Sequence, residues 1–333
     1  MEVYIGIDVG SVTTKFAVLN SADELIAHVY LPTQGKPINM VQEGLKQIKA
    51  QLPADVAICG VATTGSARYL AGVIIGADLV KNEITSHAVA TLNYVPQVQT
   101  IIEIGGQDSK IIIVRDGVVV DFGMNTVCAA GTGSFLDHQA LRLDMSIDEF
   151  SQRALESSTP VRIAGRCTVF AESDMIHKQQ MGHKTEDILY GLCQALVRNY
   201  LNNVGLGKET ASPIVFQGGV AYNRAIIKAL QEELDTGIIV PAHHEIMGAI
   251  GVAILVHEEI QDNNRKSKFS GFGVSEVEYH TSSFECQACP NLCEIAQLAL
   301  NGQVLARWGG RCDLWEGTPT TSILTEEVHE NRC

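Results

Sequence analysis

One segment near the start of the chain, residues 7–15 (IDVGSVTTK), combines the residue types that bind phosphate. Gly10 lets the backbone approach a phosphate closely, and successive N–H groups with nearby hydroxyls can surround its oxygens. Asp8 is suited to hold Mg²⁺, directly or through water. The residues that we expect to take part are Asp8, Gly10, Ser11, Val12, Thr13, Thr14 and Lys15.

A second segment, residues 105–108 (GGQD), repeats this combination, and two such loops facing each other would clamp a Mg–triphosphate. A glycine pair at 218–219 lies between a predicted strand and a predicted helix, where adenosine can rest against bare backbone. Each turn alone is more often an ordinary hairpin tip, and Lys15 and Asp108 can equally be surface charges. Together the three turns favour a nucleotide site. It is not a Walker-type P-loop, because no Gly-x4-Gly-Lys-Ser/Thr occurs.

The catalytic residues that we expect at this site are Asp8, Glu103 and Asp108. The further nucleotide-binding residues that we expect are Gly105, Gly106, Gln107, Gly131, Gly133, Gly218, Gly219 and Asn223.

Two separate cysteines, Cys128 and Cys167, each come just before a predicted helix. A helix N-terminus presents free N–H groups and the positive end of the helix dipole, so it stabilises a thiolate and an anionic cluster. The alternative is that both are small buried residues. The residue types alone do not decide between the two.

The last part of the chain carries a denser group of cysteines. Cys286, Cys289, Cys293 and Cys312 surround a predicted β-hairpin with Asn-Gly at its turn. Four thiolates can bind tetrahedral Zn²⁺ or a [4Fe-4S] cluster. The alternative is a reduced loop without function. We expect a metal-binding unit that depends on its metal to fold, because so small a β unit has little core of its own.

β-Hairpins over residues 3–18 and 100–122 must position the two glycine loops. Each half of the chain therefore opens with a hairpin, an internal repeat of architecture without obvious sequence identity. Further strands are predicted over 25–31, 56–62, 214–217, 238–240, 274–284, 294–300 and 303–308. Helices are predicted over 37–51, 67–75, 83–93, 220–234 and 245–259, and over most of 133–204 except 157–166. The expected domains are a first lobe (1–95), a second lobe (96–260), a linker (261–270) and a cysteine-rich tail (271–333).

Composition excludes several classes of protein. With 46% hydrophobic and 19% charged residues among 333, the chain is not globally disordered. A net charge of −14 argues against nucleic acid as the main partner. We expect no membrane span, since apolar stretches such as 246–256 are too short. The chain opens without a leader pattern, so we expect a cytoplasmic protein.

The order hairpin, hairpin, strand-Gly-Gly-helix resembles the actin-like ATPase superfamily, whose fold is an α/β, ribonuclease H-like duplication in two lobes. The pattern runs over 5–18, 60–65, 101–114, 215–224 and 248–253. The stretches GGQDSK, NTVCAAGTGSFLD and IAGRCTVFAESD are more specific. They resemble the activator ATPases of 2-hydroxyacyl-CoA dehydratases and the related benzoyl-CoA reductase ATPase subunits, the BadF/BadG/BcrA/BcrD type.

The resemblance implies a homodimer in which one oxygen-sensitive [4Fe-4S] cluster bridges the subunits through Cys128 and Cys167 of each. It also implies ATP/ADP and Mg²⁺ as ligands, a low-potential electron donor such as ferredoxin or flavodoxin, and an iron–sulfur protein as electron acceptor. Two thiolates from each chain agree with a four-cysteine site on a two-fold axis. The alternatives are a sugar-type kinase of the same fold and a chaperone-like ATP switch.

Two features set this chain apart from the shorter activators. Glu103 stands where many relatives have Asp, so its longer side chain can take a different role near Mg²⁺. The cysteine-rich tail resembles a segment of long multidomain relatives, which implies a partner of the double-cubane-cluster or dehydratase-like type. His177, His183, His243 and His244 show no metal-like spacing, and we expect structural or solvated roles for them.

Overall fold

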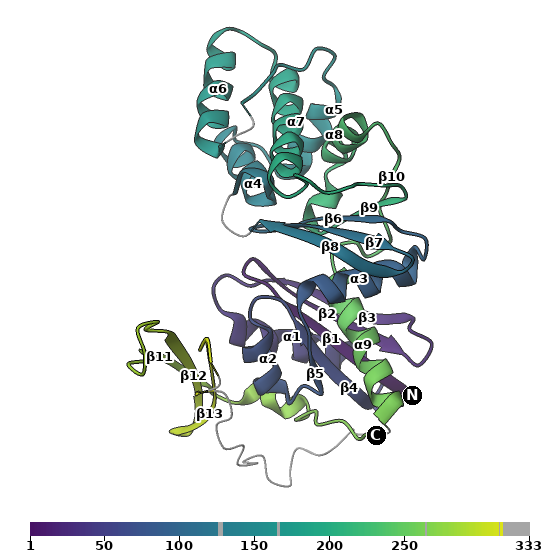
Figure 1. Ribbon diagram of the computed structural model, residues 1–333, viewed down its shortest axis with the longest axis vertical. Coiled ribbons are helices and arrows are strands. Elements are labelled where there is room, and N and C mark those ends of the chain that lie inside the picture. The colour runs from purple at the N-terminus through teal and green to yellow at the C-terminus, as the bar shows by residue number, and fades with distance from the viewer. Residues whose placement is uncertain (126–128, 165–166, 264, 313, 316–333) are drawn as a thin grey trace. The chain divides into compact units, whose positions relative to one another are not determined.

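The computed structural model describes residues 1–125, 129–164, 167–263, 265–312 and 314–315 (Figure 1). The chain divides into two compact units, Met1–Ser86 with Gly248–Cys333 and His87–Met247. Helix α3 (Glu83–Tyr94) crosses the first boundary, and helix α9 (Met247–Asn263) carries the chain back into the first unit. The predicted boundaries were 95/96 and 260/261, and the second differs because α9 packs on the first sheet.

The first unit is built on a five-stranded sheet of order β3-β2-β1-β4-β5. Its strands are β1 (Glu2–Val9), β2 (Thr13–Asn20), β3 (Leu25–Pro32), β4 (Ala57–Thr64) and β5 (Leu79–Val80). The first three strands form an antiparallel meander, whereas β4 runs parallel to β1 and β5 parallel to β4. The meander predicted at the start of the chain is confirmed.

Alternation along β1 gives the first sheet two apolar faces. Ile5 and Ile7 belong to a core that also contains residues of α1 (Pro37–Gln51) and α2 (Arg68–Ile75). On the other face, Tyr4 packs with Val252 and Val256 of α9. A Cβ on Gly6 would lie only 1.9 Å from the Ala249 carbonyl oxygen, so α9 reaches the strand because residue 6 has no side chain.

The second unit repeats this topology with a sheet of order β10-β9-β6-β7-β8. Its strands are β6 (Thr100–Ile104), β7 (Ser109–Arg115), β8 (Val118–Asn125), β9 (Ile214–Gln217) and β10 (Ile238–Ile239). Again three antiparallel strands are followed by parallel ones, β9 beside β6 and β10 beside β9. The predicted repeat of architecture is therefore confirmed.

Helices build the main core of the second unit against one face of its sheet. They are α4 (Gly133–Arg142), α5 (Ile147–Leu155), α6 (Thr168–Gln180), α7 (Thr185–Asn203) and α8 (Arg224–Leu234). Ile102, Ile104 and Phe216 from the sheet share a buried cluster with Leu196 and Tyr200 of α7. The long helical region predicted here is confirmed.

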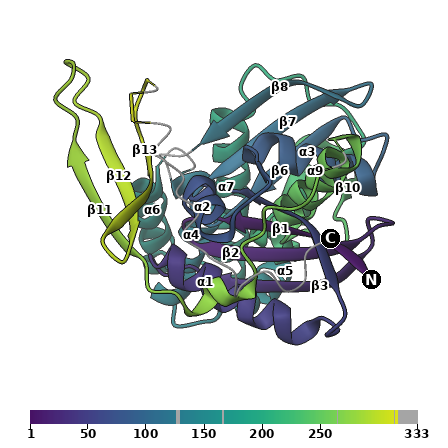
Figure 2. The same ribbon diagram turned by 90° about the horizontal axis from the view of Figure 1, so that it is seen from below.

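A third, three-stranded sheet of order β11-β12-β13 ends the described chain (Figure 2). Its strands are β11 (His280–Glu285), β12 (Glu294–Leu300) and β13 (Gln303–Trp308). The predicted Asn-Gly hairpin between the last two strands is confirmed. Leu298 belongs to the core of the first unit, so this sheet does not form the self-contained unit that the sequence suggested.

The segment that joins α9 to this sheet is docked on the first unit. Ser267 Oγ and the Lys268 backbone N–H donate to the carboxylate of Asp78 at 2.7 and 2.6 Å. Phe272 and Val274 are buried, so residues 272–276 form a 3₁₀ turn and the strand predicted over 274–284 begins only at His280. Within the described ranges no helix is long and apolar enough to span a membrane.

Candidate functional site

The first predicted loop is the turn between β1 and β2. Gly10 N–H donates to the Thr13 carbonyl at 2.9 Å, which closes the turn. Thr33, just after β3, holds the turn from outside: its N–H donates to Val12 O at 2.7 Å and its hydroxyl to Gly10 O at 2.9 Å. Ser11 is exposed at the tip. Sequence analysis missed Thr33, because it is 23 residues from Gly10.

Thr14 differs from its neighbours in this loop. Its side chain is fully buried, and its hydroxyl shares a 2.9 Å hydrogen bond with Thr33 Oγ1. Thr14 therefore stabilises the turn from its buried side, whereas Ser11 is accessible to a ligand.

An acid–lysine pair lies directly beneath the first turn. Asp8 and Lys15 are opposite each other in the register of β1 and β2, and Lys15 Nζ is 2.9 Å from Asp8 Oδ2. Asp8 is only 4% exposed. Gly65, at the end of β4, has a φ of +94°, and a Cβ there would lie 2.6 Å from Asp8 Oδ1. Only glycine fits at residue 65 beside this carboxylate.

The second loop has the same construction. Gly105 N–H donates to the Asp108 carbonyl at 3.0 Å, and Glu103 is opposite Lys110 in the register of β6 and β7. Lys110 Nζ is 2.8 Å from both Glu103 Oε2 and Asp108 Oδ2. Gln107 is exposed at the tip, between the partly exposed Gly106 and Asp108.

Charge dominates the second loop. Burial alone would lower the pKa of Lys110, but the charges of Glu103 and then Asp108 outweigh it, so the pKa is raised above its ordinary value. Lys110 is therefore a permanent cation at neutral pH. Lys15 and Asp108 both lie in ion pairs and are not plain surface charges.

The repeat extends to single residues. In both hairpins the acid precedes the lysine by seven positions, Asp8 to Lys15 and Glu103 to Lys110. The strand parallel to each acid ends in a glycine of positive φ: Gly218 has a φ of +92°, and a Cβ there would lie 2.8 Å from Glu103 Oε1. Sequence analysis missed this correspondence, although the shared seven-residue spacing was the available signal.

The third glycine element follows β9. Gly218 N–H donates to the His244 carbonyl at 2.9 Å, and Gly219 opens a short 3₁₀ helix, Gly219–Tyr222. Asn223 caps α8, since its Oδ1 accepts from the N–H groups of residues 225 and 226. The Asn223 Nδ2 atom is buried and has no hydrogen-bond partner among the described residues, so this amide has a donor left for a ligand.

Two of the glycines predicted to bind nucleotide have other contacts. Gly131 packs against α7, where a Cβ would lie 3.2 Å from Asn199 Oδ1. Gly133 begins α4, and its N–H donates to Gly105 O at 2.8 Å, while Ser134 N–H donates to Gly106 O at 2.9 Å. The first N–H groups of α4 thus bind the second loop directly.

Cys167 lies at the N-cap of α6 with extended backbone and is partly exposed. Its carbonyl accepts from Ala171 N–H at 2.9 Å, which opens the helix. Cys128, the other expected cluster ligand, lies outside the described residues. The structure therefore places one of the two thiols, at a helix N-terminus as predicted.

The segment before Cys167 is held by carboxylates that sequence analysis missed. Asp187, on α7, accepts from Ser157 Oγ at 2.7 Å and from Thr159 N–H and Oγ1 at 3.0 Å. These hydrogen bonds, that of Ser157 first, lower the Asp187 pKa from its ordinary value despite burial. Asp174, on α6, accepts from Ala164 N–H at 3.0 Å.

The four tail cysteines expected as ligands all lie in the described part of the chain, whereas Cys333 lies outside it. Cys286 is buried, Cys293 is partly exposed, and Cys289 and Cys312 are exposed; none is in a disulfide. A hydrogen bond from the Trp315 indole, and then one from the Ala288 backbone, lower the pKa of the Cys286 thiol. No three of the four sulfurs lie within 4.8 Å of one another.

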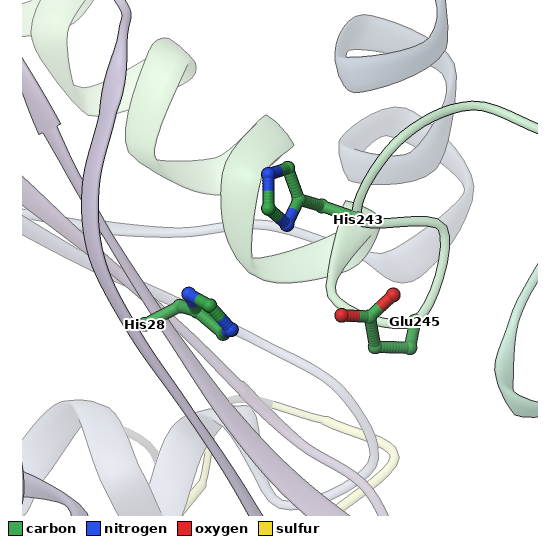
Figure 3. Close-up of side chains that lie close together, drawn as sticks. All are labelled: His28, His243 and Glu245. Carbon is green, nitrogen blue, oxygen red and sulfur yellow. The ribbon is translucent and has the colours of Figure 1, made fainter.

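Histidines give no alternative metal centre. Figure 3 draws His28, on β3 of the first unit, with His243 and Glu245, both of the second unit. We assign no site to these three side chains, because they belong to separate units. His244 makes a structural contact, its Nδ1 lying 3.1 Å from the Gly218 carbonyl oxygen.

Comparison with known proteins identifies the chain. Residues 5–256 match the BadF/BadG/BcrA/BcrD ATPase family. The chain belongs to this family. A relative named (R)-2-hydroxyglutaryl-CoA dehydratase activating ATPase, from Acidaminococcus fermentans, is 33% identical over 267 residues, which cover 78% of this chain and 99% of the relative.

Two solved structures of activators match the BadF/BadG/BcrA/BcrD fold of this chain. One is the (R)-2-hydroxyglutaryl-CoA dehydratase component A of Acidaminococcus fermentans, with a TM-score of 0.71 and 30% identity over 78% of this chain and all of that one. The other, from Clostridium difficile, is the activator of 2-hydroxyisocaproyl-CoA dehydratase with bound ADPNP, with a TM-score of 0.70 and 30% identity over 79% and 97%. The predicted actin-like α/β fold is confirmed, with a small sheet added at its end.

Proposed function

We propose that the protein is an ATP-dependent activator that transfers electrons. In this proposal it hydrolyses Mg-ATP and drives a low-potential electron from a [4Fe-4S] cluster, shared by two copies of the chain, into an iron–sulfur acceptor of the 2-hydroxyacyl-CoA dehydratase or double-cubane type. The observation that carries the proposal is the pair of hydrogen bonds from Gly133 and Ser134 to the Gly105-Gly106 loop. Because α4 directly follows the segment that carries Cys128, a movement of the Gly105-Gly106 loop would move this proposed cluster ligand.

The two turns have the donors that a nucleotide needs. Carboxylates favour Mg²⁺, and Asp8 and Asp108 are the side chains that would hold it. Lys15 and Lys110 form ion pairs with these acids and would offset the charge of phosphate oxygens. Bound Mg²⁺ would supply charge stabilisation for transfer of the terminal phosphoryl group. The chain's own part is to orient the phosphates on backbone N–H groups and to hold both acids in place.

The donor set at Cys167 also fits the proposed cluster. A thiolate at the N-terminus of α6 is stabilised by the helix dipole, and two such cysteines from each of two chains complete four ligands. Val169 and Phe170, directly after Cys167, are 66% and 67% exposed. Large exposed apolar side chains beside the thiol support a surface that another protein covers, either the second copy or the acceptor.

The names of the relatives support the acceptor and do not favour a small-molecule kinase, the other function that we considered. A ferredoxin or flavodoxin as electron donor and a cytoplasmic location complete the proposal. The electron donor is what the resemblance to this family implies, and the location is the expectation from the opening of the sequence.

Replacing the proposed cluster ligand tests this function. Cys167→Ser should abolish electron transfer to the acceptor and the absorption of the shared cluster in anaerobically purified protein, while nucleotide binding persists. Cys193→Ala is the matched control, because Cys193 is buried in the core and burial raises its thiol pKa. An unchanged rate of electron transfer in Cys167→Ser would refute the proposal, as would ATP-dependent phosphorylation of a sugar.

A further inference from the structure

Two cysteines face each other where β11 and β12 join. The register of these strands ends with Glu285 opposite Glu294, and the next pair is Cys286 and Cys293. Cys286 N–H donates to the Cys293 carbonyl at 2.8 Å, so the pairing continues through both cysteines. Cys289 lies in the loop between them, where its carbonyl accepts from Leu292 N–H at 3.2 Å. One short loop thus presents three thiols.

The chain brings a fourth thiol to the same end of the sheet. Strand β13 runs antiparallel to β12, with Trp308 opposite Ala296. Beyond it, Gly309 adopts a φ of +104°, and a Cβ there would lie 2.6 Å from the Glu294 carbonyl oxygen. A Cβ on Gly310 would be 3.6 Å from Ile295 Cδ1. Gly309 and Gly310 therefore lie beside the start of β12, at the end of the sheet where Cys293 also lies, and Cys312 follows two residues later.

The surroundings of Cys286 suit a negatively charged sulfur. Trp315 Nε1 donates to Cys286 Sγ at 3.2 Å, and the Ala288 N–H donates to the same atom. The Trp315 ring is fixed in turn by an edge contact with Phe284, at 5.0 Å between centroids. N–H donors directed at a thiolate sulfur tune its electronics and hold its position as a ligand.

Packing does not account for the other thiols. Cys289 and Cys312 are exposed, although free cysteine is among the residues most often buried. Cys286, Cys289, Cys293 and Cys312 are all free thiols in the structure. Two cysteines opposite each other, a third in their loop and a fourth that follows β13 form a donor set of the size that a four-thiolate centre requires.

We propose that Cys286, Cys289, Cys293 and Cys312 hold an iron–sulfur cluster of their own, separate from Cys128 and Cys167. Four thiolates on one Zn²⁺ ion stand roughly 3.8 Å apart, given Zn–S bonds of about 2.3 Å in a tetrahedron. No three of these sulfurs approach one another within 4.8 Å. Ligands of a four-iron cluster stand further apart, because each binds a different iron. The sulfurs are thus not gathered as closely as one tetrahedral zinc ion needs, so we commit to the cluster, and bound zinc would count against the proposal.

This centre does not depend on the proposed function. It lies beyond residue 256, where the match to the ATPase family ends. The tail would bind its cluster whether or not the rest of the chain shares one with a second copy.

Iron and sulfide analysis of the full chain, reconstituted anaerobically with iron and sulfide, tests the proposal. Cys167→Ser removes any shared cluster, and this variant should still hold about four iron atoms per chain. Adding Cys286→Ser should bring the iron content close to zero, whereas adding Cys193→Ala should leave it unchanged. If the chain forms no shared cluster, the wild type and Cys167→Ser should contain the same amount of iron, all of it in the tail.

Tryptophan emission gives a second, local measurement. The chain has two tryptophans, Trp308 and Trp315, and both lie in the tail. Reconstitution should quench their emission in Cys167→Ser by several-fold, and the quenching should be lost in its combination with Cys289→Ser or Cys312→Ser. Both positions are exposed, so these changes leave the packing of the sheet intact. Bound zinc without sulfide, a Cys286–Cys293 disulfide, or no metal at all would overturn the proposal.

Discussion

The acid–lysine pair is the unit that both halves of the chain repeat. Asp8 and Glu103 are buried, and each meets a lysine from the neighbouring strand. Burial of a carboxylate without a partner costs free energy, and the lysine supplies the opposite charge that offsets this cost. In the proposed function, each loop would receive phosphate oxygens and Mg²⁺ without rearranging these charges.

Asp8→Asn tests the first pair. The amide keeps the size of the side chain and can accept from Lys15, but it loses the charge that would hold Mg²⁺. We expect ATP hydrolysis to fall by roughly 10²-fold or more, with the fold intact by circular dichroism. Asp55→Asn, an exposed acid of the same unit, is the control and should keep full activity. Normal turnover in Asp8→Asn would remove Asp8 from the catalytic set.

Lys110→Met tests the second pair through stability. The change leaves Glu103 buried without its cation, which should cost about 3–5 kcal/mol in the free energy of unfolding. Lys15→Met should cost less, because the Lys15 side chain is 17% exposed and that of Lys110 only 3%. Urea unfolding of both variants measures the difference. Glu103→Gln added to Lys110→Met should restore part of the loss, and equal costs for the two lysines would contradict the argument.

At the scale of elements, hydrophobic periodicity predicted nearly every helix and strand, including both hairpins and the Asn-Gly turn. The prediction failed where contacts between residues far apart in the chain determine the backbone conformation. A strand was predicted over 274–284, but Phe272 and Val274 are buried in the core of the first unit, the backbone forms a turn over 272–276, and the strand begins at His280. The polar run before them resembled a free linker, yet Asp78, 190 residues earlier in the chain than Lys268, binds it.

The candidate site was only partly visible in the sequence for the same reason. Glycine and acid spacing marked both loops, since these residues are adjacent in the chain. Thr33 and Asp187 act across the fold, and nothing near them in the sequence indicates their partners. Gly133 was recognised as special, but only the structure shows that its N–H is used by the loop at Gly105.

Gly133→Ala tests the connection between the second loop and α4. A Cβ there would lie 2.9 Å from Val220 Cγ2 and 3.1 Å from Gly105 O, so the start of α4 must move away from the loop. We expect nucleotide binding to persist while the effect of nucleotide on the cluster weakens. The measurement is the rate at which an iron chelator removes the cluster with ADP or with a non-hydrolysable ATP analogue.

In the wild type these two rates should differ, and in Gly133→Ala they should converge. Gly182→Ala is a control for the loss of a glycine, because no atom lies within 4 Å of a Cβ at that surface turn, although its φ of +79° adds some strain. Retention of the full nucleotide effect in Gly133→Ala would show that the signal does not pass through these hydrogen bonds.

Asp187 should make the segment before Cys167 sensitive to acid. Its folded-state pKa is lowered, so its contribution to stability is present above the unfolded value of about 3.9 and is lost as pH falls through the folded value. Asp187→Asn should be less stable at pH 7 by about 1.5–3 kcal/mol and should approach the wild type as pH falls below about 4. Urea unfolding at a series of pH values measures this, and a difference that is independent of pH would contradict it.

At the scale of the whole molecule, the tail packs against the part of the chain that matches the ATPase family. Leu298 of β12 lies in the same buried cluster as Ile5 and Ile7 of β1, so the tail is part of the fold of the first unit. Tests of either cluster therefore need the full chain, because cutting the tail away would uncover that core. Point substitutions at the thiols separate the two centres without this damage.

The proposed exchange with an acceptor must obey thermodynamic linkage. ATP can favour one state of the protein only by its difference in affinity for the two states, and acceptor binding must favour the ATP-bound form by the same factor. With a dehydratase-type iron–sulfur protein as the probe, we expect about 5–150-fold tighter binding with a non-hydrolysable ATP analogue than with ADP. Calorimetric titration in both directions supplies the check: the acceptor should raise the affinity for the analogue, relative to ADP, by an equal factor.

Asp55→Asn should keep this ratio and Gly133→Ala should reduce it. Identical acceptor affinity with both nucleotides would leave electron transfer independent of nucleotide state, and the hydrogen bonds from α4 to the Gly105 loop would then be structural alone.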